Sequence, residues 1–378
     1  MNLNDLVVRY GEKIGEISSG DELLKRYNPW DTKAVDNLVK KFKWALDKNS
    51  KDFSWLNIEK ELLGLKRDSK PNIHFGIPNH VHGDIENGTF YLCMINPNIA
   101  IKDPIVRSVD GLKTYFEREE TKTSKDPSLH VQELNESELK EFVKKHVVNI
   151  EKTGSILLNE LNCIKEEKIE IEGKEISFEA EDAYYLKNYF SPICAIFLDK
   201  DKKSNEFGDL KNSLSEKEWA SLIEMSKSVV NLEAFPFRSK NPNFTQKNTT
   251  TFANEIVASQ SRVGMLSSRI IIWRICRYIK NQDSVKPIFI FRKFKTAWLP
   301  SLQNVLMNDL EYTEDEVEEL IALLHQEFFY TIEKQDFFGE GGNTLITKGK
   351  KSHTYKNDVV IEADDFYDIV KSALKKSN

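Results

Sequence analysis

The sequence predicts an α/β fold: a three-layer α/β/α arrangement around a central, mainly parallel four-stranded sheet. Two observations carry this prediction. Unbroken apolar runs at 90–95 and 287–291 are short and bounded by turn formers, as in strands buried on both faces of a parallel sheet, and a further strand is expected at 229–234. Helical patterns of apolar residues precede, separate and follow these runs. N-terminal helices and an inserted α+β segment are expected to complete the fold.

Residues 1–70 are predicted to form an N-terminal helical layer that covers the sheet. The apolar residues of 35–46 recur at the spacing of one helix face, and 55–65 suggests a second helix. Nothing in this layer has a catalytic pattern. Residues 311–378 are assigned to a C-terminal helical extension, which begins at the capping-box pattern Thr313-Glu314-Asp315-Glu316.

The chain is organised around the stretch 74–100. A polar, turn-rich run leads into the apolar run Phe90–Ile95, which ends abruptly at Asn96-Pro97-Asn98. Pro97 fixes its own φ and favours an extended conformation at Asn96. The Asn96 side chain is therefore expected at the carboxyl end of a central strand, where open α/β sheets bind ligands. The alternative is a plain strand-ending turn, since Asn and Pro are common turn formers.

Three pieces of the chain carry a resemblance to a known family. Gly83-Asp84, the apolar run and Met94-Ile95-Asn96-Pro97-Asn98 resemble the first motif of the uracil-DNA-glycosylase-like superfamily, in particular the branch with Gly-Ile-Asn-Pro-Gly. Asn231–Ser239 and Ile288–Arg292, which Trp298 follows, are similar to later pieces of the same superfamily. Together the three pieces span about half of the chain, and their order strengthens the resemblance.

The resemblance implies a DNA glycosylase that hydrolyses the N-glycosidic bond of a base in DNA, modified or unmodified, without a metal or another cofactor. Asn96 would position the attacking water, and Arg292 would donate to the leaving base or hold a phosphate. Arg292 could equally pair with an acid in the core. The expected pocket for the base is lined by Pro97, Asn98, Phe235, Phe237, Arg238 and Ser239, with Tyr115 or Phe116 as stacking candidates.

The sequence departs from the family at two positions. Asn98 stands where the family has glycine, which crowds the backbone approach to a base. The strand 287–291 is followed by Arg292-Lys293, where the family offers a histidine or Asn-Pro-Ser. The family's core strands also lie closer together in sequence. We therefore expect a core over 71–310 with an insertion at about 105–182, and that insertion includes a predicted hairpin around Glu172-Gly173-Lys174.

Charge is distributed unevenly along a chain whose net charge is −6. Residues 238–300 contain twelve Lys or Arg and two acids, which leaves 42 basic and 58 acidic residues elsewhere. Such an uneven distribution of charge favours a polyanion partner, either duplex or single-stranded DNA, although a basic face could instead balance acids of the same fold. The expected contacts are Lys240, Arg262, Arg269, Lys293 and Lys295. Roughly four to six phosphate contacts to duplex DNA would give a log–log salt slope of about −4 to −5.

Other classes of function remain as alternatives. A catalytically inactive protein on the same fold could bind nucleic acid or a nucleotide. A weaker alternative is a metal-dependent hydrolase built on His80, His82 and Asp84 near His74, although no HExxH or CxxC pattern accompanies them. Four scattered cysteines, no apolar run of about 18 residues and no signal-like N-terminus indicate a cytoplasmic protein without a membrane span. The sequence does not indicate an oligomeric state.

Overall fold

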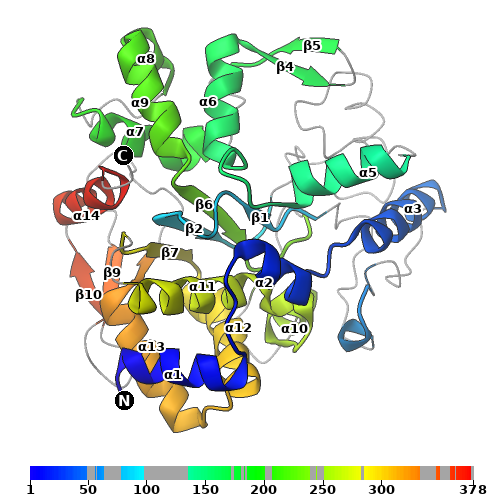
Figure 1. The fold of residues 1–378 in the computed structure, drawn as a ribbon. Helices are drawn as coiled ribbons and strands as arrows, with labels where there is room; N and C mark the ends of the chain where they lie inside the picture. The colour runs from blue at the N-terminus through cyan, green and yellow to red at the C-terminus, as the bar shows by residue number, and fades with distance from the viewer. Residues whose placement is uncertain are drawn as a thin grey trace.

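A single eight-stranded sheet forms the centre of the computed structural model, and helices cover both of its faces (Figure 1). The structure describes residues 1–48, 56, 58–63, 78–97, 135–171, 174–179, 183, 185–200, 207–238, 244, 251–281, 285–332, 346–349, 358–361 and 363–375. The strands of the sheet are β1 Val81–His82, β2 Phe90–Met94, β3 Val148–Asn149, β6 Val229–Glu233, β7 Ile288–Arg292, β8 Phe329–Ile332, β9 Ile346–Gly349 and β10 Asp358–Ile361.

The order of the strands is β10-β9-β8-β7-β2-β6-β1-β3, and the sheet is mixed. β6, β2, β7 and β8 are adjacent and run parallel to one another. β9 is antiparallel to β8, β10 is antiparallel to β9, and β1 is antiparallel to β6. A separate antiparallel hairpin consists of β4 Lys168–Ile171 and β5 Lys174–Ser177.

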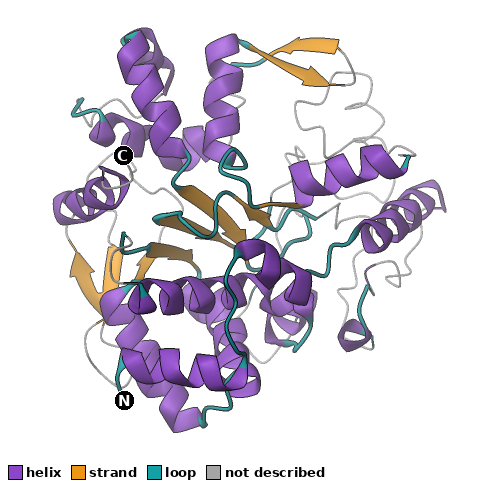
Figure 2. Cartoon of the chain, viewed as in Figure 1, coloured by secondary structure: helices purple, strands orange, loops and turns teal. Residues whose placement is uncertain are grey.

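Helices form one layer on each side of the sheet, as the colouring by secondary structure in Figure 2 makes visible. The lower layer in Figure 1 contains α1 Leu3–Lys13, α2 Gly20–Tyr27, α10 Phe252–Ala258, α11 Arg262–Lys280, α12 Leu299–Asn304 and α13 Glu314–Glu327. The upper layer contains α6 Ile156–Glu166, α7 Ser191–Phe197, α8 Phe207–Asn212 and α9 Glu216–Ser226, with α14 Ala363–Lys375 beside it. The remaining elements are α3 Thr32–Lys48, α5 Glu136–Phe142, the 3₁₀ turn η2 Lys60–Leu62 and the π-helical turns η6 Val143–Val147, η8 Leu186–Phe190, η9 Phe294–Trp298 and η10 Val305–Asp309.

The two helical layers explain why the predicted strand at 90–95 has no polar alternation. In β2, Tyr91 and Cys93 pack in the lower hydrophobic cluster, whereas Phe90, Leu92 and Met94 pack in the upper one. All five residues are buried. A strand that is covered on both faces needs apolar residues at every position, so β2 is a continuous apolar run.

Several sequence predictions are confirmed. The chain is an α/β protein, and the helix predicted from the 35–46 pattern is α3. The predicted capping box is present at α13, where Thr313 accepts from the Glu316 backbone, and α9 begins with another, in which Ser215 accepts from the Glu218 backbone. The hairpin predicted around 172–174 is β4 and β5.

Other predictions need correction. The sheet is larger and more mixed than the four-stranded sheet that we expected, and it continues beyond residue 310. Residues 311–378, which we expected to be a helical extension, supply β8, β9 and β10 as well as α13 and α14. The 105–182 segment contributes β3 to the main sheet, although its part over 105–134, with Tyr115 and Phe116, lies outside the described residues. Of the second helix expected at 55–65, the structure describes the turn η2.

Candidate functional site

The carboxyl ends of the parallel strands meet at one edge of the sheet, as the sequence predicts. Met94 ends β2 and is paired in register with Glu233, the last residue of β6. Cys93 is paired with Phe291 on the other side, so the next residue of β7, Arg292, lies beside Met94. Adjacent strands are about 4.8 Å apart, which places the Cα atoms of Glu233 and Arg292 roughly 10 Å apart across Met94.

Asn96 lies at this edge, two residues beyond the end of β2. It is half-buried, and its Nδ2 donates to the carbonyl oxygen of Pro97 at 2.9 Å. The backbone N–H groups of Ala234 and Phe235 donate to the carbonyls of Met94 and Ile95 at 3.2 and 2.9 Å. These bonds continue the β2–β6 pairing beyond the strands, so Asn96 and the turn after β6 leave the sheet side by side. Asn98, Ser239 and Lys240 lie outside the described residues.

Phe235 and Phe237 do not line an accessible pocket. Both are fully buried in the lower core, where their rings lie 5.5 Å apart between centroids. Phe235 also contacts Phe252, and Phe237 contacts Trp30, at centroid distances of 5.8 and 5.9 Å. The structure therefore assigns both rings to packing beneath the sheet edge, and our expectation that they line a base pocket needs correction. The apolar residues around Pro236 serve to fix the turn.

Glu233 is the residue at this edge that sequence reasoning missed. Its side chain is 1% exposed, on the upper face of the sheet. Oε1 accepts a hydrogen bond from the Tyr185 hydroxyl at 3.1 Å, and Oε2 is buried with no hydrogen-bond partner among the described residues. No ion pair joins Glu233 to any residue that the structure describes, although Arg238 and Arg292 are close enough to influence its charge.

The ionisation of Glu233 is strongly perturbed. Burial raises the pKa of Glu233 to about 8, against the opposing effects of the Tyr185 hydrogen bond and the positive charges of Arg292 and Arg238. Desolvation outweighs the two arginines because neither forms an ion pair with the carboxyl. Perturbed carboxyl groups of this kind concentrate at functional sites.

A second glutamate holds the segment that covers Glu233. Glu160 of α6 is buried and accepts from the backbone N–H groups of Tyr185 and Leu186 at 3.0 and 2.6 Å. These bonds fix the start of the π-helical turn η8, whose Tyr189 accepts a hydrogen bond from Nη1 of Arg292 and lies beneath its guanidinium. Burial raises the pKa of Glu160 to about 7. Tyr185 and Tyr189 therefore reach Glu233 and Arg292 from one fixed segment.

The upper face of β6 carries a further buried polar residue, Asn231. It is 1% exposed, and neither its Oδ1 nor its Nδ2 has a hydrogen-bond partner within the described structure. His82 of β1 is its register partner. Buried amides without partners are rare and destabilising. The signal was present in the sequence Val229-Val230-Asn231-Leu232-Glu233, where polar residues occupy alternate positions of a strand that is otherwise apolar.

The histidines near β1 do not form a metal site in the part of the chain that the structure describes, where no three His, Cys, Asp or Glu side chains are grouped suitably. His80 Nδ1 instead accepts from the Trp30 indole N–H at 2.8 Å, and burial lowers the pKa of His80 to about 3. Asp84 accepts from the backbone N–H groups of Glu86 and Asn87 in a turn. His74 lies outside the described residues.

The basic segment does not form a continuous cationic surface, because most of its described charges are either buried or paired with acids from distant parts of the chain. Ion pairs join Arg262 to Glu59, Arg269 to Asp309, Arg277 to Glu86, Lys280 to Glu16 and Lys286 to Glu327. Arg274 is buried and donates to the carbonyls of Gly88 and Val285. Lys293 and Lys295 are exposed and form no ion pair with a described residue. The expected DNA contacts Arg262 and Arg269 are thus engaged within the fold.

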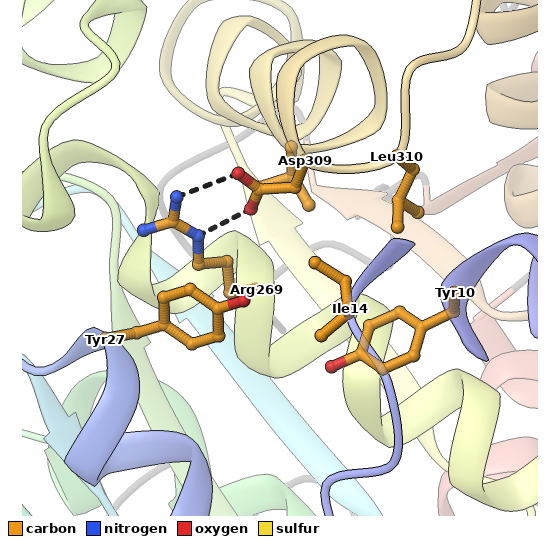
Figure 3. Close-up of a pocket in the computed structure, with 7 residues that line it drawn as sticks. Tyr10, Ile14, Tyr27, Arg269, Asp309 and Leu310 are labelled. Atoms are coloured by element: carbon orange, nitrogen blue, oxygen red, sulfur yellow. Dashed lines mark hydrogen bonds and ion pairs between the residues drawn. The ribbon is translucent and has the colours of Figure 1, made fainter. Parts of the chain in front are cut away.

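Arg269 is the clearest example of a cation of this segment that is engaged within the fold (Figure 3). Its Nε and Nη2 donate to the two carboxylate oxygens of Asp309 at 2.6 and 3.0 Å, and its guanidinium lies 4.4 Å from the Tyr27 ring centroid. The small hollow at this point is also lined by Tyr10, Ile14 and Leu310. It lies among lower-layer helices and contains none of the strand-end residues, so we treat it as a packing feature.

Comparisons with known proteins found no family model, no curated protein and no solved structure that matches this chain. None of the helices that the structure describes is long and apolar enough to cross a membrane.

Proposed function

We propose that the chain hydrolyses the N-glycosidic bond of a base in DNA, modified or unmodified, at the carboxyl edge of its parallel strands. The observation that carries the proposal is the position of Asn96, which follows β2 between the ends of β6 and β7. The four adjacent parallel strands are compatible with the parallel core that the resemblance to uracil-DNA-glycosylase-like proteins implies.

The residues at this edge suit the reaction. Breaking a C1′–N bond requires a placed water, stabilisation of the leaving base and a site that excludes bulk solvent. Asn96 has an amide that is oriented by its bond to Pro97, which fits the placement of water. Arg292 is held against Tyr189, so its remaining N–H groups have a defined direction towards a leaving base or a phosphate.

A second candidate is a protein that binds nucleic acid or a nucleotide without cleaving it. The ion pairs of the basic segment favour this alternative, because they leave few of its cations to contact the phosphates of a duplex. A nucleotide, by contrast, needs only the groups around Arg292.

Base release tests the proposal directly. The purified protein is incubated with duplex and single-stranded oligonucleotides that contain uracil, hypoxanthine or other modified bases. Released base is measured by mass spectrometry, and abasic sites by alkaline strand cleavage. Asn96→Ala should reduce release by about 10²–10³-fold while DNA binding stays nearly intact, because its role is in the chemical step. Asn159→Ala, at an exposed position on α6, is the matched control and should change neither.

Two results would contradict this assignment. Equal loss of release and of binding in Asn96→Ala would mean that Asn96 is structural. Binding without release by the wild-type protein, for every base tested, would leave the binding protein as the function.

A further inference from the structure

We propose that Glu233 donates the proton to the departing base, so that the preferred substrate carries a base that leaves as a neutral species rather than as a stabilised anion. This inference rests on the proposed function, to which it adds a catalytic residue and a class of leaving group. Neither was apparent from the strand-end motif, because Glu233 lies inside the predicted strand.

Geometry singles out Glu233 among the buried acids of the described chain. One of its oxygens is oriented by Tyr185, and the other is buried without a partner. Glu160 is also buried with a raised pKa, yet both of its oxygens accept backbone N–H groups. Glu233 therefore has one oxygen without a hydrogen-bond partner among the described residues, whereas both oxygens of Glu160 are engaged.

Three side chains influence Glu233. Tyr185 approaches from the segment before η8, Arg292 from the end of β7 and Arg238 from the turn after β6. Because Oε1 accepts from Tyr185, the proton of the neutral carboxyl belongs on Oε2. Burial keeps the pKa of Glu233 near 8, so this proton is present at neutral pH.

The reaction balances with water as the only co-reactant. As the C1′–N bond breaks, its electron pair moves to the base, and the Glu233 proton transfers to a ring nitrogen or a carbonyl oxygen of the base. The carboxylate that forms is stabilised by the Tyr185 hydroxyl and by the charges of Arg238 and Arg292. Water then adds to the sugar cation at C1′, and the proton that it loses returns to Glu233. The products are the sugar with a C1′ hydroxyl and the neutral base.

The experiment measures base release as a function of pH for oligonucleotides whose leaving bases differ in acidity. Wild-type kcat should fall above about pH 8, as Glu233 loses its proton. Glu233→Gln should be slower by about 10²–10⁴-fold for bases that are poor anions and should lack the alkaline limb. Its rate should approach that of the wild type for bases that leave as stable anions. Glu160→Gln, the matched buried acid, should keep the alkaline limb.

The outcomes separate this inference from the proposed function. If Glu233→Gln retains the alkaline limb, or loses the same factor for every leaving base, Glu233 is not the donor even though the enzyme is a glycosylase. If the wild-type protein releases no base, both ideas fall. Should Glu233→Gln fail to fold, the dependence of the wild-type rate on the acidity of the leaving base still tests the role of Glu233. General-acid catalysis predicts rates that depend weakly on leaving-base acidity, and a steep dependence would refute it.

Discussion

Replacing Glu233 with glutamine should stabilise the protein increasingly as the pH rises from 5 to 7. The folded carboxyl has a pKa of about 8, against an ordinary value of 4.5. As the pH rises through this window, the unfolded chain releases the proton while the folded chain retains it. The free energy of unfolding of the wild-type protein therefore decreases as the pH rises. Glutamine does not titrate, so this decrease is absent from the Glu233→Gln variant.

The two pKa values set the magnitude. Between pH 5 and pH 7 the wild-type protein should lose about 2.5 kcal/mol of stability through this one group, and the Glu233→Gln variant should not. Glutamine keeps nearly the same volume and an oxygen that can accept from Tyr185, so packing should change little. Glu160 also titrates in this window, with a pKa of about 7, but it is present in both proteins and cancels in the difference.

Urea unfolding of the two proteins at pH 5, 6 and 7, at one ionic strength, provides the measurement. The stability of Glu233→Gln relative to the wild type should increase steadily across the series. The opposite trend would refute the reasoning. A variant that becomes relatively less stable towards pH 7 would show that Arg238 and Arg292 hold Glu233 ionised, and the proton donor would then be lost.

Two further predictions concern the basic segment. Three described cations of the segment are not buried and have no acidic partner among the described residues: Arg292, Lys293 and Lys295. They should give duplex binding a log–log salt slope of about −2 to −3, which anisotropy can measure. Arg292→Glu with Lys293→Glu should flatten it, and a slope of −4 or steeper would mean that other cations contribute. Arg269→Ala should lower the free energy of unfolding by about 3 kcal/mol, because it leaves Asp309 largely buried without its partner. A loss below about 1 kcal/mol in urea unfolding would show that solvent screens this pair.

Local patterns account for what the sequence could predict. The β2 run is apolar throughout because it is covered on both faces, and α9 and α13 begin at capping boxes that a few neighbouring residues define. The position of Asn96 follows from the same local logic, since a strand that ends at Asn-Pro must present the next side chain at the sheet edge. Such features depend on contacts within one element.

The features that the sequence did not reveal depend on contacts between distant segments. The Tyr185–Glu233 hydrogen bond spans 48 residues, and no periodicity reports it. The basic segment suggested an open surface because its partners, such as Glu16 and Glu59, belong to the N-terminal layer. β8 was missed because its four residues follow α13 after a single residue and have no turn former before them.

Packing alone does not explain why two buried polar residues lie on the upper face of β6. Asn231 and Glu233 lie two residues apart on the same face of a central strand, and each has at least one polar atom without a partner among the described residues. Apolar residues at both positions would pack without this penalty, since buried polar groups stabilise only when their hydrogen bonds are complete. A glutamate whose removal increases stability and abolishes proton transfer would show that the unfavourable burial serves the reaction. A glutamate whose removal only destabilises the fold would belong to the core.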